Sequence, residues 1–194
     1  MARAPWCGEA VYAEAARFRD ECLIEDGSLI TPGLQIWNQG LTDALETLIT
    51  PVDSGTFIEN LVNQLTGHAD EEKQLAAEAL YVALLFDSTT TPAKLKDQVT
   101  AVLDTCGASL GLPDRMSAAL AAGGVANIGA GMAFRWAHVD GLLQLAREVK
   151  SLSTTQREVV FNEPRDAREL VIRAFGTRAA IAGRCLLHLW YPDT

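Results

Sequence analysis

The stretch that decides the fold is Leu75-Ala-Ala-Glu-Ala-Leu-Tyr-Val-Ala-Leu-Leu-Phe86, in which Glu78 is the one residue that is not hydrophobic. Three acids, Asp70, Glu71 and Glu72, come just before it. Negative charge suits the first turn of a helix, where it meets the positive end of the helix dipole. Because a helix that is apolar on nearly every side must be buried, we predict that this segment is the central helix of an all-α protein.

The segments on either side show the same helical period. From Glu9 to Ile24, Val11, Ala15, Phe18 and Cys22 recur at spacings of four, three and four, which places them on one helix face. Further helix starts are indicated by capping residues and prolines at Thr31-Pro32, Ser54, Thr91-Pro92, Pro113, Ser153 and Pro164. The first of these, at Thr31-Pro32, predicts a helix that carries Trp37, Leu41, Leu45 and Leu48 and ends at Pro51.

We therefore expect one all-α domain over residues 1–194, with about eight or nine helices. Sustained period-two alternation and a fixed internal repeat do not occur in the sequence, which argues against a β-protein and a solenoid.

A glycine-rich segment, residues 123–131, interrupts the helical pattern before it resumes at His138. A phosphate-binding loop would follow a strand and carry a Lys followed by Ser or Thr, which this segment does not. We interpret it as a mobile connector and a possible sub-boundary between two helical parts. A short β-hairpin or extended arm led by Met132 to Trp136 is the minor alternative.

Charge is unevenly distributed in this chain of net charge −9. Residues 1–134 hold 7 Lys and Arg against 18 Asp and Glu, whereas residues 135–194 hold 9 against 7. An acidic front half repels phosphate backbones, so a nucleic-acid contact would have to come from the C-terminal third. The candidate DNA-binding residues are Arg135, Trp136, Arg165, Arg168 and Arg173, with Arg135 and Trp136 able to grip phosphate and stack a base. A solvated surface is the alternative interpretation.

The cysteines and histidines show no spacing typical of a metal site. Cys7, Cys22, Cys106 and Cys185 form no CxxC pair, and we expect reduced, buried thiols in a cytoplasmic protein. None of His68, His138 and His188 has a second ligand type at i+3 or i+4 in a plausible metal arrangement. Residues 1–8 do not form a signal peptide and no run of 18 apolar residues occurs, so we expect no membrane contact.

The sequence shows no catalytic constellation either. The partners that a Ser/His/Asp or Cys/His hydrolase needs cannot be placed, and the acids at positions 70–72 are explained by the helix dipole rather than by acid–base chemistry. We expect a chain that is not itself an enzyme and holds no metal or cofactor.

The end of the chain carries a resemblance to a known family. Cys185-Leu-Leu-His-Leu-Trp-Tyr-Pro-Asp-Thr194 is similar to the (Ala/Met)-Leu-Leu-His-Leu-Leu-Phe-Pro-Asp-Thr-Phe-Glu pattern of bacterial Mcr-type AAA+ ATPases. These are relatives of the GTP-dependent subunit of the modified-cytosine restriction system, in which this pattern lies just before the ATPase core. The order of Gly141–Leu152, Ser153–Phe161 and Pro164–Glu169 also resembles that family. The resemblance covers roughly residues 135–194 and is specific over the last ten.

The resemblance implies an N-terminal recognition or regulatory domain serving DNA restriction and anti-phage defence. Because a Walker lysine, a Walker B acid and an arginine finger do not occur here, any NTPase activity would lie in an AAA+ core expected after residue 194. The implied partners are that core, DNA, and a partner nuclease or another protein. His188, Trp190 and Tyr191 would then contact the core. The alternative is a helical protein-interaction or oligomerisation module that binds no nucleic acid.

Overall fold

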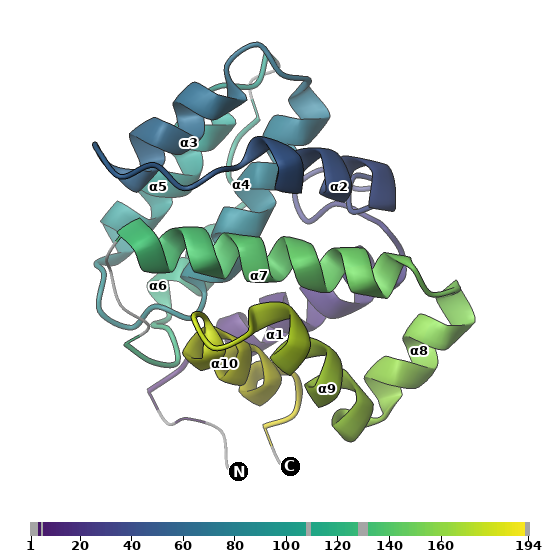
Figure 1. Ribbon diagram of the computed structural model, residues 1–194. Helices are drawn as coiled ribbons and strands as arrows, with labels where there is room; N and C mark the ends of the chain where they lie inside the picture. The colour runs from purple at the N-terminus through teal and green to yellow at the C-terminus, as the bar shows by residue number, and fades with distance from the viewer. Residues whose placement is uncertain (1–3, 5, 108–109, 128–131, 193–194) are drawn as a thin grey trace.

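Helices account for all the regular structure in the computed structural model (Figure 1), which describes residues 4, 6–107, 110–127 and 132–192. The elements are α1 (Glu9–Arg17), η1 (Phe18–Ile24), α2 (Gln39–Leu48), α3 (Phe57–Leu65), α4 (Asp70–Leu84), α5 (Pro92–Leu103), α6 (Asp114–Ala121), α7 (Met132–Lys150), α8 (Thr154–Asn162), α9 (Pro164–Phe175) and α10 (Ala180–Trp190). No strand occurs within the described ranges, where one isolated bridge joins Asp87 to Ala126. The predicted all-α fold is confirmed, and the number of helices is close to the expected eight or nine. In the same ranges, no helix is both long and apolar enough to cross a bilayer.

The helix α4 lies at the centre, as its composition predicts. Every residue from Leu75 to Phe86 is buried, and Asp70, Glu71 and Glu72 occupy the first turn. The helices α2, α5 and α7 pack against α4, and Figure 1 shows α4 passing behind α7. Burying each large apolar side chain stabilises the fold by about 1.5–3 kcal/mol, so this one segment supplies a large share of the core.

A second group of helices packs on the other side of α7. The helix α9 packs against α7, α8 and α10, and α10 packs in turn against α1. The ring of Phe175 lies where α7, α9 and α10 meet, because the glycines Gly141 and Gly183 face it. A Cβ on Gly141 would lie 2.8 Å from Phe175 Cδ1, and one on Gly183 would lie 3.2 Å from Phe175 Cγ. These two glycines therefore let three helices approach one another closely.

The predicted helix start at Thr31-Pro32 is wrong. Residues 25–38 are not helical, and α2 begins at Gln39, where the side chain of Asn38 accepts a hydrogen bond from Leu41 N. The spacing of Trp37 from Leu41 fits a helix, but the Trp37 indole is directed to another partner. Its Nε1 donates to the Glu78 carboxylate at 2.7 Å, so the chain remains a loop as far as the cap.

Glu78 is the polar centre of the core. Its carboxylate is fully buried and accepts hydrogen bonds from the backbone N–H groups of Leu29 (3.0 Å) and Ile30 (3.1 Å). The Ser28 hydroxyl donates at 2.5 Å and the Gln74 amide at 3.1 Å. A buried charge is tolerated only when it is fully hydrogen-bonded, and here the loop that precedes α2 supplies most of the donors.

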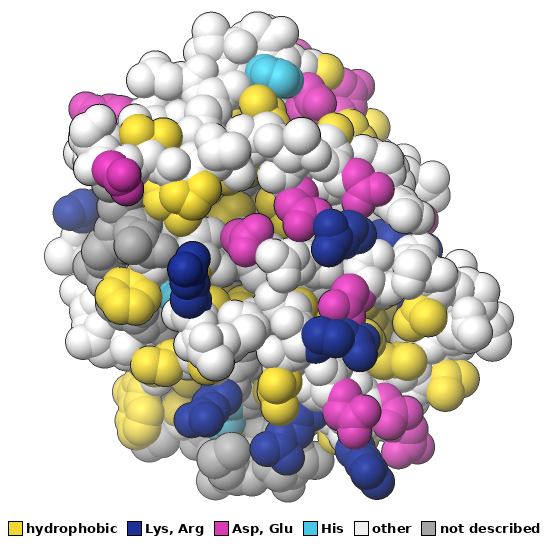
Figure 2. Space-filling view, viewed as in Figure 1, with side chains coloured by type: hydrophobic (Ala, Val, Ile, Leu, Met, Phe, Trp, Pro, Cys, Tyr) yellow, Lys and Arg dark blue, Asp and Glu magenta, His cyan; other side chains and the backbone are white. Residues whose placement is uncertain are grey.

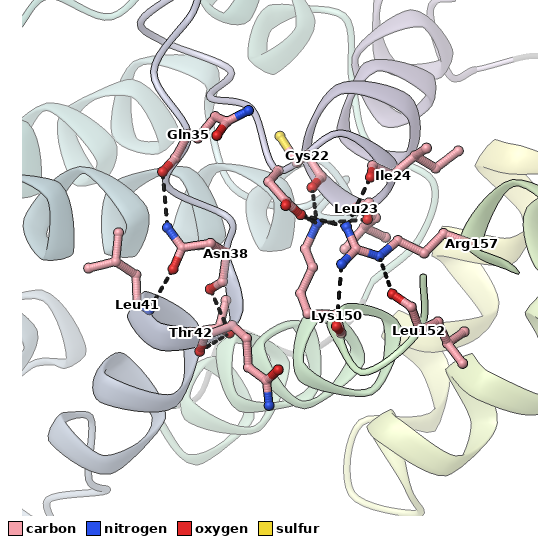
Figure 3. Close-up of polar contacts among 12 residues, drawn as sticks. Cys22, Leu23, Ile24, Gln35, Asn38, Leu41, Thr42, Lys150, Leu152 and Arg157 are labelled. Carbon is pink, nitrogen blue, oxygen red and sulfur yellow. Dashed lines mark hydrogen bonds and ion pairs between the residues drawn. The ribbon is translucent and has the colours of Figure 1, made fainter. Parts of the chain in front are cut away.

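The predicted helix over residues 9–24 is helical throughout, but its second half, η1, has π-helical winding. Its terminal carbonyls are met by two basic side chains (Figure 3). The Lys150 ammonium donates to the carbonyl oxygens of Cys22 and Leu23 at 2.5 and 2.7 Å, and the Arg157 guanidinium donates to that of Ile24 at 3.0 Å. Cations at this end suit the negative end of the helix dipole and donate to carbonyl oxygens of its last turn.

The carboxylate of Asp26 neutralises both of these basic side chains. It lies 2.5 Å from Lys150 Nζ and 2.6 Å from Arg157 Nη1. Burial nevertheless lowers the pKa of Lys150 to about 8, and the hydrogen bond from Lys150 to Asp26 opposes this shift. Both side chains are buried, so these two bases hold the fold together and are not available at the surface.

The described part of the glycine-rich segment is tied to the end of α4. Ala126 N donates to Phe86 O and Ser88 N donates to Ala126 O, both at 3.0 Å. A Cβ on Gly124 would lie 2.4 Å from the Asp87 carbonyl carbon, so only glycine permits this approach. Residues 123–127 thus pack against the core, which corrects the mobile-connector interpretation for them, and residues 128–131 lie outside the described residues.

The helix α7 begins at Met132 rather than at His138. The alternative of a hairpin or extended arm over Met132 to Trp136 is therefore wrong. The charged Arg135 hides the start of the helix in the sequence, because it stands at a buried position where an apolar residue would continue the pattern.

The Glu78 network predicts a large effect on stability. We expect Glu78→Gln to lower the free energy of unfolding by about 3 kcal/mol, because the uncharged amide cannot accept from all of these donors. Urea denaturation measures this change. Glu169→Gln, at a side chain that is 68% exposed, serves as the control and should change stability by less than about 0.5 kcal/mol. Equal stabilities of the two variants would contradict the assignment.

Candidate recognition surface

The helix α9 separates its side chains cleanly into a buried and an exposed side. Pro164 stands in its first turn, and Gly176, with φ of 53°, ends it. The buried side consists of Ala167, Leu170, Val171, Ala174 and Phe175. The exposed side carries Arg165, Arg168, Ile172 and Arg173. An amphipathic helix of this kind packs through its apolar stripe and presents its charged side to solvent.

The helix α10 and the turn before it add to the same region. Arg178, Ile181 and Arg184 are exposed, and Ile172 and Ile181 are each 54% exposed. Residues 164–190 hold five arginines against Asp166 and Glu169, a net charge of +3 in a chain of net charge −9. Figure 2 shows Lys and Arg side chains in a band across the middle and lower part of the view, where Figure 1 places α7, α9 and α10. We call Arg165, Arg168, Arg173, Arg178 and Arg184 the arginine face.

The five arginines differ in how far they are neutralised. Arg173 pairs with Glu148 at 2.6 Å, and Arg165 lies 3.6 Å from Glu169 with both side chains largely exposed. Exposed pairs of this kind contribute little to stability and dissociate readily. Arg168, Arg178 and Arg184 have no ion pair to any described residue. These three guanidinium groups are free to meet a ligand.

Two hollows flank the ring of Phe175. The groove between α9 and α10 has a volume of about 360 Å³, and its apolar floor is rimmed by Arg168 and Arg184. A second hollow of about 660 Å³ lies between α7 and the turn from α9 to α10. Exposed Phe134, Asp140 and Arg178 line this second hollow. The arginine face is therefore a corrugated surface rather than a flat one.

Arg135, a predicted DNA-binding residue, lies inside the protein. It is 4% exposed, and its Nη2 donates to the Asp87 carboxylate. Burial disfavours the charged form of Asp87, but hydrogen bonds from Thr90, Thr89 and Arg135 outweigh it and hold the pKa of Asp87 well below its usual range. Arg135 thus joins the start of α7 to the end of α4 and is almost wholly buried.

Trp136 is buried as well. It is 4% exposed, and its ring packs edge-on against Phe57 with centroids 4.6 Å apart. The predicted stacking of a base by Trp136 beside Arg135 is not possible in this arrangement. The structure leaves Arg165, Arg168 and Arg173 exposed and adds Arg178 and Arg184. The sequence signal that could have found these two is the excess of arginine in the C-terminal third of the chain.

The residues predicted to contact an AAA+ core make contacts within this domain. Trp190 is 6% exposed, and its Nε1 donates to Ala15 O at 2.8 Å. The Tyr191 hydroxyl donates to Phe161 O at 2.6 Å, and His188 Nε2 lies 2.9 Å from the Tyr12 hydroxyl. Trp190 is therefore not the exposed apolar surface that the sequence suggested, while His188 and Tyr191 are partly exposed.

All four cysteines are free and buried, as predicted. Burial raises the pKa of the Cys7 thiol to about 11 and that of Cys185 to about 12. Within the described ranges, no group of three or more His, Cys, Asp or Glu side chains is arranged to hold a metal ion.

Comparisons with protein-family models, curated proteins and solved structures found no match to this chain.

The buried His138 predicts a stability change in acid. Burial and the nearby Arg135 charge lower the pKa of His138 from its usual 6.5 to about 4. In the unfolded chain His138 therefore takes up a proton near pH 6.5, whereas in the folded chain it stays neutral until the pH falls to about 4. This contribution to stability is complete above pH 6.5 and is lost as the pH falls towards 4.

Urea denaturation at pH 7 and pH 4 tests this prediction. Between these values the native protein should lose up to about 3 kcal/mol more stability than the His138→Gln variant. Parallel losses in the two proteins would show that His138 is not the group that resists protonation.

Proposed function

We propose that this chain is a non-catalytic recognition or regulatory domain of an Mcr-like AAA+ ATPase, acting in the cytoplasm in DNA restriction and anti-phage defence. The resemblance of Cys185–Thr194 supports the family. The observation that carries a binding role is the arginine face, which sets five exposed arginines on two adjacent helices and the turn between them in an otherwise acidic protein. In this proposal the chain itself needs no cofactor, and NTPase chemistry belongs to the core expected after residue 194.

The arginine face supports contact with the DNA backbone. Guanidinium groups bind phosphate oxygens in a bidentate manner, and exposed arginines on neighbouring helices can meet several phosphates together. The acidic scaffold opposes this approach, so binding should be weak and should fall steeply as salt rises. The candidates that remain from the sequence for this contact are Arg165, Arg168 and Arg173.

Fluorescence anisotropy with plain and cytosine-modified duplexes, at low and moderate salt, tests DNA recognition. The native chain should bind at low salt. The Arg165→Ala/Arg173→Ala variant should bind about tenfold more weakly, and its dependence of log K on log salt should be shallower by about two. Lys94→Ala/Lys96→Ala on α5 removes the same charge elsewhere and is the control. No binding of the native chain to any duplex at low salt would refute DNA recognition.

A second candidate function is a protein-interaction or oligomerisation module without nucleic-acid binding. The half-exposed Ile172 and Ile181 favour it, because they stand among the arginines of the same surface. Interfaces between proteins are enriched in arginine and bury apolar side chains at their centre, whereas phosphate contacts need none. Self-association of the native chain in sedimentation, lost in Ile172→Ser/Ile181→Ser, would support this second function, and duplex binding by the native chain would count against it.

A further inference from the structure

The groove between α9 and α10 combines an apolar floor with cations on both rims. Its floor holds Val171, Phe175, Gly183 and Leu187, and its rims carry Arg168 from α9 and Arg184 from α10. Gly183 lets α10 lie close against the floor, because a Cβ there would lie 3.2 Å from both Val171 Cγ1 and Phe175 Cγ. Beside Arg168, Ile172 extends the apolar lining and is 54% exposed.

The two rim arginines determine the charge of the occupant. Both are exposed, and neither has an ion pair within the described part of the chain. Arginine on each side of an apolar floor complements a segment that has carboxylates flanking apolar side chains. A nucleic-acid backbone could satisfy the arginines but has no apolar side chain to fill the floor. The combination therefore favours a protein segment over DNA.

We propose that the groove between α9 and α10 docks an acidic amphipathic helix of a partner protein. Apolar side chains one helical turn apart enter between Val171 and Leu187, and flanking glutamates or aspartates pair with Arg168 and Arg184. In recognition of this kind, apolar side chains at positions i, i+4 and i+7 on one face of the helix enter the groove. The inference goes beyond the proposed function and does not depend on DNA binding, for which the test variant replaces Arg165 and Arg173.

The test uses a fluorescein-labelled, end-capped peptide with leucines at i, i+4 and i+7 flanked by glutamates. A second peptide of equal charge has serine in place of each leucine. Anisotropy titration of the full chain should show binding of the leucine peptide and at least about tenfold weaker binding of the serine peptide. Arg168→Glu/Arg184→Glu should weaken binding of the leucine peptide by at least about tenfold. Lys94→Glu/Lys96→Glu, an equal charge change on α5, should leave it within about twofold.

Circular dichroism melting confirms that each variant is folded, and Arg168→Gln/Arg184→Gln replaces the pair if the glutamates unfold the chain. Equal binding of the two peptides would overturn the proposal, because attraction would then be electrostatic alone. A larger loss in Arg165→Glu/Arg173→Glu than in Arg168→Glu/Arg184→Glu would overturn it as well, since the binding site would lie outside the groove.

Two further outcomes would show that the groove binds something other than an acidic helix of a partner protein. If sedimentation shows a dimer that Arg168→Glu/Arg184→Glu dissociates, the groove holds a second copy of this chain. If a DNA duplex binds and the Arg168→Glu/Arg184→Glu variant loses it while the leucine peptide fails to bind, the rim arginines serve nucleic acid. Peptide binding without duplex binding would support the groove as a peptide site and refute the DNA proposal. The two proposals can therefore be refuted independently of each other.

Discussion

The buried carboxylate of Glu78 is the constraint on which the rest of the fold depends. A charge at the centre of a helix-packed core must find donors, and it finds them in the loop before α2. The N–H of Leu29 donates to Glu78, while the carbonyl of the same residue accepts from Arg115. Arg115 also pairs with the buried Glu14, which accepts from the Tyr81 hydroxyl on α4 at 3.1 Å. One polar network therefore fixes α1, α4, α6 and the loop before α2 together.

The same constraint explains which parts of the fold the sequence predicts. The central helix can be predicted because its apolar run is long and three acidic residues stand in its first turn. The cap and proline signals at Thr91-Pro92, Ser153 and Pro164 likewise place α5, α8 and α9, because such signals are local. The loop over residues 25–38 cannot be predicted from the sequence, because the side chain of Trp37 donates a hydrogen bond to a carboxylate 41 residues later in the chain. No local pattern can reveal a partner at that distance.

The candidate site was predictable in part for the same reason. Exposure of Arg165, Arg168 and Arg173 follows from the amphipathic pattern of their own helix. Arg135 and Trp136 look equally suitable for DNA binding in the sequence. In the structure both are buried, Arg135 in an ion pair with Asp87 and Trp136 against the ring of Phe57. A charged residue that is buried by a distant acid has the same local signature as one in solvent. Burial of Trp190 against Ala15 O is a long-range feature of the same kind.

The distribution of charge unites fold and function. The acidic part of the chain builds the scaffold, with Glu14, Glu78 and Asp87 buried in its polar contacts. The basic side chains of Arg135, Lys150 and Arg157 are used inside the scaffold. Within the described residues, the arginines without an ion pair lie on α9, on α10 and in the turn between them. The surface of α9 and α10 can thus bind a partner without disturbing the core that supports it.

Hydrogen–deuterium exchange of the chain, with and without a saturating ligand, tests most directly whether binding is confined to that surface. The ligand is the leucine peptide or a DNA duplex, whichever binds. Added protection should fall within residues 164–190, with α2 to α5 unchanged. Protection centred on α2 to α5, with residues 164–190 unaffected, would contradict the account.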